Sequence, residues 1–181
     1  MGLIIEQSDA TQSTEVTWDP RLVEADRYWR SKCAGREMPR RADIDPTEIR
    51  GLLPHLMLLD IDASGRPKYR LIGTEVEQRI GYAVTGRYVD EIVPEKYGQY
   101  LRGLYDKLLS TRRPIFSNSV YGPSNSAVTP EFYLLRTSRY MAPLSSDGTV
   151  IDMVLACQTF ETRPTVVNAT VLDLADYFEG T

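Results

Sequence analysis

The sequence predicts an α+β domain: a five-stranded antiparallel sheet that receives its helices after the second strand and carries a helical extension at its N-terminus. Three observations support this fold class. Apolar residues recur at helical spacing in two stretches, five short stretches have the composition or alternation of strands, and helices separate the first two strands from the last three. With 181 residues the chain can bury about 70% of its unfolded surface, which suits one domain.

The first helix is predicted to begin at Asp19 and to end by Gly35. Aspartate can accept hydrogen bonds from the free N–H groups of a first turn, and Pro20 suits the first helical position. An apolar stripe follows at helical spacing, formed by Leu22, Ala25, Trp29 and Cys33. This stripe needs an apolar surface to cover it.

A short helix and a hairpin come next. The Asp-Pro-Thr-Glu sequence at 45–48 offers a capping aspartate and a glutamate placed for a capping box, and Pro54 should end that helix. Residues 56–61 are an apolar run, residues 68–72 alternate, and the cluster at 63–67 has turn composition. We expect an antiparallel hairpin here.

The inserted helices and the last three strands complete the pattern. Residues 74–92 hold glycines and scattered apolar positions, which is typical of short helical turns, and Pro94 opens a longer helix. The apolar stripe of that helix is Tyr97, Leu101, Leu104, Tyr105 and Leu108. The remaining strands are predicted at 115–121, 132–142 and 149–160, with a loop at 122–130 and a turn at 145–148.

We therefore divide the chain into four parts: a flexible acidic tail, an N-terminal helical extension, a sheet core and a second acidic tail. Their bounds are 1–18, 19–53, 54–161 and 162–181. Residues 27–41 hold six basic residues and one acidic residue, but the net charge of the whole chain is −4. A solvated helix face explains this cluster better than a nucleic-acid site, so we predict no nucleic-acid partner.

Several function classes are excluded by residues that the sequence lacks. One histidine cannot build a multi-histidine metal site, and two cysteines far apart in the sequence suggest neither a disulfide framework nor a zinc cluster. We predict no catalytic residues and no metal. The sequence contains no signal-peptide pattern and no run of about 20 apolar residues, so we expect a cytoplasmic protein without a membrane partner.

Six short motifs occur in a fixed order between residues 20 and 160. They are Tyr28-Trp29, the element Pro-Arg-Arg-Ala-Asp-Ile-Asp-Pro at 39–46, Leu53-Pro54, Asp60, Tyr-Arg-Leu-Ile-Gly-Thr at 69–74, and Gly81 followed by Thr85-Gly86. In this order they resemble a subfamily of short, stand-alone bacterial PAS proteins. The element at 39–46 departs from that pattern by one extra arginine.

The resemblance implies a PAS-like fold and a non-enzymatic sensor or adaptor of signal transduction. Such modules act by binding a small ligand, by protein association, or by both. Flavin and p-coumarate versions need a suitably placed cysteine, and haem versions commonly use a histidine on the long helix. Residues 74–111 contain neither residue type, so we predict no haem or flavin cofactor and leave open an unknown small molecule.

Candidate ligand-pocket residues lie on the strands, at Tyr69, Tyr133, Arg136, Tyr140 and Met153. If the set that contains Arg136 and Tyr140 faces inward, these two side chains could hold a carboxylate. A one-residue change of register would turn the set outward, and a filled core without a cavity is the alternative. We also expect Arg70 to form a structural ion pair with Asp43 or Asp45.

The resemblance also implies partners. We expect a homodimer built by the first helix through Leu22 and Trp29, with the signal delivered by contact with a separate signalling protein. The alternative function is a small cone-shaped α+β hydratase or isomerase with a carboxylate base, for which Asp60 and Asp62 are the candidates. Their position beside a turn favours solvated carboxylates instead.

Overall fold

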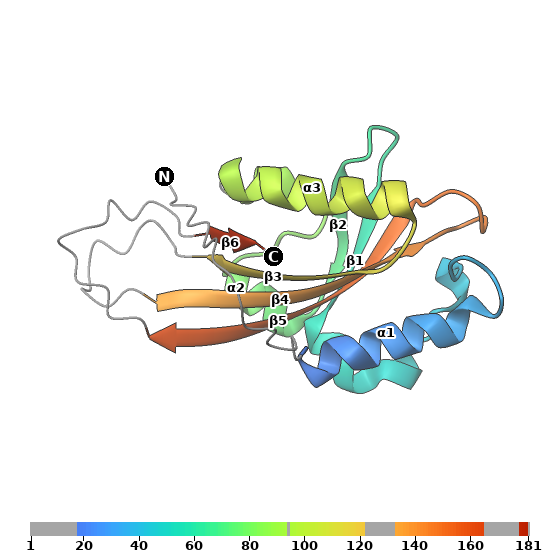
Figure 1. The fold of residues 1–181 in the computed structure, drawn as a ribbon, viewed down its shortest axis with the longest axis horizontal. Coiled ribbons are helices and arrows are strands. Elements are labelled where there is room, and N and C mark those ends of the chain that lie inside the picture. Colours follow the sequence, from blue (N-terminus) through green and yellow to red (C-terminus); the bar gives the residue numbers. More distant parts are fainter. Residues whose placement is uncertain (1–17, 94, 122–132, 165–177, 181) are drawn as a thin grey trace, which may run out of the picture. The chain divides into compact units, whose positions relative to one another are not determined.

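A computed structural model describes residues 18–93, 95–121, 133–164 and 178–180 (Figure 1). The chain forms two compact units. The larger one comprises residues 19–116 and 139–159, and the smaller one contains the described parts of 117–138 and 160–181. Most of the two predicted tails, and the predicted loop at 122–130, lie outside the described residues.

The first helix, α1, spans Pro20–Cys33, as its start signal predicts. The Asp19 side chain accepts a hydrogen bond from the backbone N–H of Arg21 at 2.9 Å, and Pro20 occupies the first turn. The helix ends where Ala34 adopts a left-handed conformation with φ of 49°. Local capping therefore sets both ends of this element.

A short 3-10 turn, η1 (Arg41–Asp43), leads to the second helix, η2 (Pro46–His55), which is a 3-10 helix with a kink at Ile49. Asp45 caps it by accepting from the backbone N–H of Thr47 at 2.8 Å. The predicted capping box is absent, because the carboxylate of Glu48 pairs with Lys32 of α1 instead.

The five predicted strands are confirmed. They are β1 (Leu56–Ile61), β2 (Pro67–Ile72), β3 (Ile115–Tyr121), β4 (Tyr133–Leu144) and β5 (Met153–Pro164). A further short strand, β6 (Phe178–Gly180), pairs with β3 in the order β2-β1-β5-β4-β3-β6. Three residues are too few to show an alternating pattern, so the sequence predicts only an acidic tail at this position.

Strand register divides the side chains of β1 between two faces. Leu58 lies opposite Leu71 of β2 and Leu155 of β5, so these three leucines share one face of the sheet. Leu59 lies opposite Tyr69 and points to the other face, since neighbouring residues of a strand alternate. The register shifts between Leu58 and Leu59, and this irregularity allows Tyr69 and Leu71, two positions apart on β2, to lie on opposite faces.

Helices cover both faces of the sheet in the larger unit (Figure 1). The inserted segment contains α2 (Thr74–Ile80), the 3-10 turn η3 (Val89–Glu91) and the long helix α3 (Glu95–Thr111). Helix α3 lies on the face of Tyr69. Burial is the main cause that raises the pKa of Tyr105 on α3, and the nearby Tyr69 raises it further. Helices α1 and η2 lie on the opposite face.

The apolar stripe of α1 is covered within the single chain. Leu22, Ala25 and Trp29 are at most 4% exposed. The indole N–H of Trp29 donates a buried hydrogen bond to the carbonyl of Pro143 on β4 at 2.8 Å. Leu22 and Trp29 therefore pack on their own sheet, and the unpaired apolar surface from which a dimer helix was predicted is already filled.

Candidate ligand site

The strand register separates the pocket residues that the sequence analysis grouped together. Tyr140 of β4 contacts Phe116 with 5.1 Å between ring centroids, and its hydroxyl lies near Asp26 of α1. The neighbouring Arg139 lies over the ring of Tyr97 of α3 at 5.3 Å. Tyr140 and Tyr69 thus point to opposite faces and cannot line one pocket.

The hypothesis of an Arg136–Tyr140 clamp for a carboxylate is not supported at Tyr140. This residue is fully buried, and the carboxylate of Asp26 is its neighbour, which would repel an anion. The side chains of Tyr133 and Arg136 lie outside the described part of the structure. Met153 is half-buried at the start of β5, opposite Asp60.

On the face of α3, the side chains around Tyr69 are buried. Tyr69, Tyr105, Leu108 and Arg139 are all buried. Burial raises the pKa of Tyr69 to about 12 and lowers the pKa of Arg139 to about 10. A cleft near Tyr105 measures about 10 Å³, which holds at most one water molecule.

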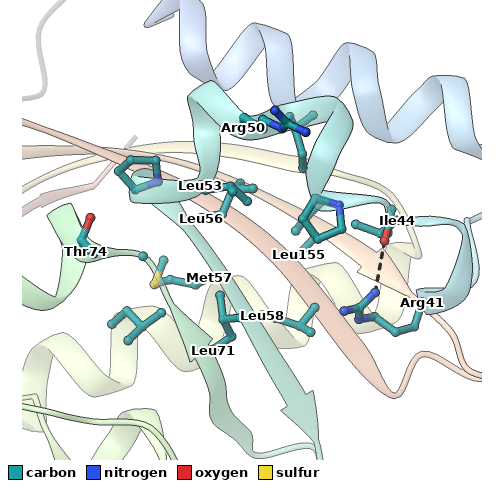
Figure 2. A pocket seen from close by; sticks show the side chains of 15 residues that line it. Arg41, Ile44, Arg50, Leu53, Leu56, Met57, Leu58, Leu71, Thr74 and Leu155 are labelled. Atoms are coloured by element: carbon teal, nitrogen blue, oxygen red, sulfur yellow. Dashed lines mark hydrogen bonds between the residues drawn. The ribbon is translucent and has the colours of Figure 1, made fainter.

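A much larger cavity lies on the opposite face, between η2 and strands β1 and β2 (Figure 2). Its volume is about 520 Å³, within the range of about 300–1,000 Å³ typical of small-molecule sites. Its sheet wall consists mainly of Leu56, Leu58, Leu71 and Leu155, and its roof on η2 includes Ile49, Leu53 and Pro54. The site is therefore predominantly apolar.

The mouth of this cavity exposes two leucines. Leu53 of η2 is 37% exposed and Leu71 of β2 is 51% exposed, whereas Leu58 between them is buried. Exposed leucines carry little information singly, but two that border one apolar cavity mark a surface that can be covered by a ligand.

One end of the roof is held against the start of α2 by a glycine. A Cβ atom on Gly73 would lie 2.3 Å from the carbonyl oxygens of both Leu53 and Pro54. The backbone N–H of Gly73 also donates to the carbonyl of Leu56 at 2.7 Å. Only glycine permits this backbone contact.

The other end of the roof is held by backbone and side-chain hydrogen bonds. The N–H of Arg41 donates to the carbonyl of Ser145 at 2.9 Å, where residues 40 and 145 form an isolated bridge. The hydroxyl of Tyr28 on α1 accepts from the N–H of Asp45 at 2.8 Å and donates to its carbonyl at 3.1 Å. With both ends held, η2 spans the cavity without collapsing onto the sheet.

The polar side chains of the cavity wall are Arg41, Arg50 and Thr74, and the wall contains no carboxylate. The Arg41 guanidinium donates from Nη1 to the carbonyl of Ile44 at 3.3 Å (Figure 2). Among the described residues, neither arginine forms an ion pair. Arg50 contributes to the lowered pKa of Asp45, whose main cause is the hydrogen bond from the Thr47 backbone.

The predicted ion pair between Arg70 and the aspartates at 43 and 45 is wrong. Arg70 instead contacts Asp60 across the hairpin at 3.3 Å. Asp43 accepts from Arg36 at 2.6 Å and from the backbone N–H of Arg40 at 2.7 Å. Asp43 thus binds donors close to it in sequence, and Asp60 binds a donor on the adjacent strand. These donors are nearer to the carboxylates than an arginine on the other side of the sheet would be.

The two carboxylates considered for an enzyme serve local structure. Asp60 pairs with Arg70 at the surface. Asp62 accepts hydrogen bonds from the hydroxyl and N–H of Ser64 and from the N–H of Arg66, and these lower the pKa of Asp62 to about 2. A general base needs a pKa nearer the working pH, and neither residue lines the cavity.

Metal-binding groups and membrane-spanning helices are the remaining features to consider in the described residues. Among the described residues, no group of three metal-binding side chains occurs. His55 is engaged instead with Arg21, whose Nη1 lies 2.8 Å from its Nε2. In that same part of the chain, none of the helices combines the length and the apolar character needed to cross a bilayer.

Comparison with protein families agrees with the strand order and the inserted helices. A family model described as PAS domain matches residues 19–153. The chain belongs to the PAS domain family. The match confirms the predicted resemblance to PAS domains and the fold class, and the matched residues include α1 and η2. No curated protein matches the chain.

Membership of the PAS family supports a sensor-type signalling module in general terms. The cavity residues of this PAS domain differ from the predicted ones, which lie on β2, β4 and β5. The available signal was Leu71, an apolar residue between an exposed arginine and the end of β2. Leu71 marks a cavity only because η2 lies near it in the fold, and η2 is more than ten positions away in sequence.

Proposed function

We propose that this PAS domain is a non-enzymatic sensor or adaptor of signal transduction that binds a small, mainly apolar molecule beneath η2. The observation that carries the proposal is the apolar cavity of about 520 Å³ between η2 and the β1–β2 hairpin. It is much larger than the described cleft near Tyr105, which measures about 10 Å³.

Ligand binding at this site would act on the N-terminal extension. A molecule beneath η2 contacts its roof and the sheet at once, and it stabilises the arrangement in which both are in place. Leu53 belongs to the roof and is exposed. A shift of η2 on ligand binding would therefore change the surface that another protein can contact. A separate signalling protein that reads this surface would complete the adaptor function.

Homodimerisation is a second, independent proposal for assembly. It needs a surface other than the buried stripe of Leu22 and Trp29. Native mass spectrometry of the purified chain measures the dimer and any co-purified ligand in one spectrum. A monomer at every concentration tested would contradict the dimer and leave the cavity proposal standing.

The ligand proposal is tested with Nile red, a neutral apolar dye whose fluorescence reports binding. We expect saturable binding by the full chain, with one dye per protomer. Leu71→Gln replaces part of the apolar cavity wall with a polar side chain. We expect this variant to bind the dye about tenfold more weakly, because burying a leucine is worth about 1.5–3 kcal/mol. Val150→Gln is the control, since Val150 is 60% exposed and lies outside the cavity.

Two results would contradict the proposal. The first is the absence of saturable dye binding by a folded wild-type chain. The second is equal loss of affinity in Leu71→Gln and Val150→Gln, which would place the dye on general surface instead of in the cavity.

A further inference from the structure

We infer that the molecule held beneath η2 is an amphipathic oxyanion, with an apolar chain in the cavity and a carboxylate or phosphate head bound by Arg41, while Arg50 adds positive charge to the same wall. The inference rests on the proposed function of the cavity as a ligand site. It adds the charge of the ligand and the residues that recognise it.

The charge pattern of the wall points to an anion. Two arginines line the cavity and no aspartate or glutamate does. A neutral apolar ligand would pair with neither of these charges. An anionic head next to Arg41 pairs with them, while the leucines enclose the chain.

Seven other arginines of the described part have carboxylate partners. They are Arg21, Arg30, Arg36, Arg66, Arg70, Arg102 and Arg112. Arg41 and Arg50 are in no ion pair formed by the described residues, which is also true of exposed arginines such as Arg27 and Arg40. Their place on the wall of an apolar cavity distinguishes Arg41 and Arg50, and their charge is available to a ligand there.

Arg41 is held in position for binding. Its backbone is fixed by the hydrogen bond to Ser145 and by its own carbonyl, which accepts from the N–H of Ile44 at 3.2 Å. Its side chain is half-buried, and one nitrogen, Nη1, donates to the Ile44 carbonyl. A guanidinium has five N–H donors, so donors remain for two parallel hydrogen bonds to an oxyanion.

The cavity also has the shape that an amphipathic molecule requires. In Figure 2, Arg41 lies at one end, beside Ile44, and Thr74 lies at the other, beyond Met57. Leu58 and Leu71 lie between these ends. A head at Arg41 therefore directs the chain along the leucine wall toward the start of α2.

The test compares three probes that share one ten-carbon alkyl chain: undecanoate, decyl phosphate and decanol. Their affinities for the full chain are measured by displacement of Nile red. We expect at least one anion to bind about tenfold more tightly than decanol, as one charge-assisted hydrogen-bonded pair supplies. The stronger of the two anions identifies the head group as carboxylate or phosphate.

Variants then assign the head to its residues. Arg41→Gln should remove the preference for the anion and leave the affinity for decanol unchanged, and Arg50→Gln should reduce the preference less. Arg70→Gln is the matched control, because Arg70 is an exposed arginine of β2 that pairs with Asp60 and does not line the cavity. Cooperative thermal unfolding of each variant verifies folding, and if Arg41→Gln fails to fold, Arg41→Lys replaces it and should weaken the anion preference.

The outcomes separate this inference from the function on which it rests. Equal affinity for decanol and both anions overturns the oxyanion and leaves the apolar site intact. An anion preference that survives Arg41→Gln and Arg50→Gln overturns the assignment of the head to these arginines. If neither Nile red nor any probe binds, the proposed function and the inference both fail.

Discussion

Replacement of Gly73 by alanine should destabilise the domain and displace the roof of the cavity. The added methyl would stand 2.3 Å from the carbonyl oxygens of Leu53 and Pro54, and ordinary contact begins at 3.4 Å. The two backbones must therefore separate by about 1 Å. Both oxygens belong to main chain, so a side-chain rotation cannot relieve the contact.

The size of the effect follows from two costs and one gain. Forcing a methyl into a filled space costs about 1–3 kcal/mol. Separation also strains the 2.7 Å hydrogen bond from the N–H of Gly73 to the carbonyl of Leu56, and losing such a bond costs about 1–3 kcal/mol. The lower entropy of the unfolded alanine chain offsets about 0.4–1 kcal/mol. We expect a net loss of about 2–4 kcal/mol, a large share of the roughly 5–15 kcal/mol of a typical domain.

Gly51→Ala is the matched control, because Gly51 lies on the same helix η2 and a Cβ there meets no atom within 4 Å. Urea unfolding followed by tryptophan fluorescence gives the free energy of unfolding of both variants, and Nile red binding reports on the cavity. Gly73→Ala should lower the urea midpoint and weaken the dye, with Gly51→Ala close to wild type. Equal midpoints for the two variants would refute the steric reasoning.

Three other perturbations test the packing and the electrostatics of the described residues. Trp29→Phe should lower the free energy of unfolding by about 1–3 kcal/mol in urea titrations, since the buried carbonyl of Pro143 loses its donor; an unchanged midpoint would show that the bond adds nothing. Burial raises the pKa of Cys157 to about 12, so iodoacetamide at pH 8 should alkylate half-buried Cys33 first and Cys157 only on unfolding, as peptide masses will report. Turn hydrogen bonds lower the pKa of Asp62 to about 2, below its unfolded value of about 3.9. The stability that these bonds add is fully present above about pH 3.9 and is lost as the pH falls toward 2. A carboxyl NMR titration of Asp62 with a midpoint near 3.9 would contradict this.

Much of the fold could be predicted because its signals are local. The Asp-Pro pair at 19–20 predicts the start of α1, and the alternation at 68–72 predicts β2 beside β1. These features depend on residues within one turn or one hairpin, where capping and periodicity act directly. The order of the six motifs predicts membership of the PAS family, which the family match confirms.

The candidate site could not be predicted in the same way. Whether Tyr140 faces α1 or α3 depends on register between strands, and one residue of shift reverses it. The cavity depends on the backbone contact between Gly73 and η2, whose members are about twenty positions apart. The sequence suggests Asp43 or Asp45 as the partner of Arg70, and only the distances in the folded chain show that it pairs with Asp60.

The sequence by itself determined the class of fold, the limits of most helices and strands, and the family. Only the tertiary structure decided which face of the sheet carries a cavity, that α1 covers its own sheet, and which arginines remain at an apolar wall without a carboxylate. The physical reason is the range of the forces involved. Caps and periodicity act over a few residues, whereas burial and ion pairing depend on segments brought together by the fold.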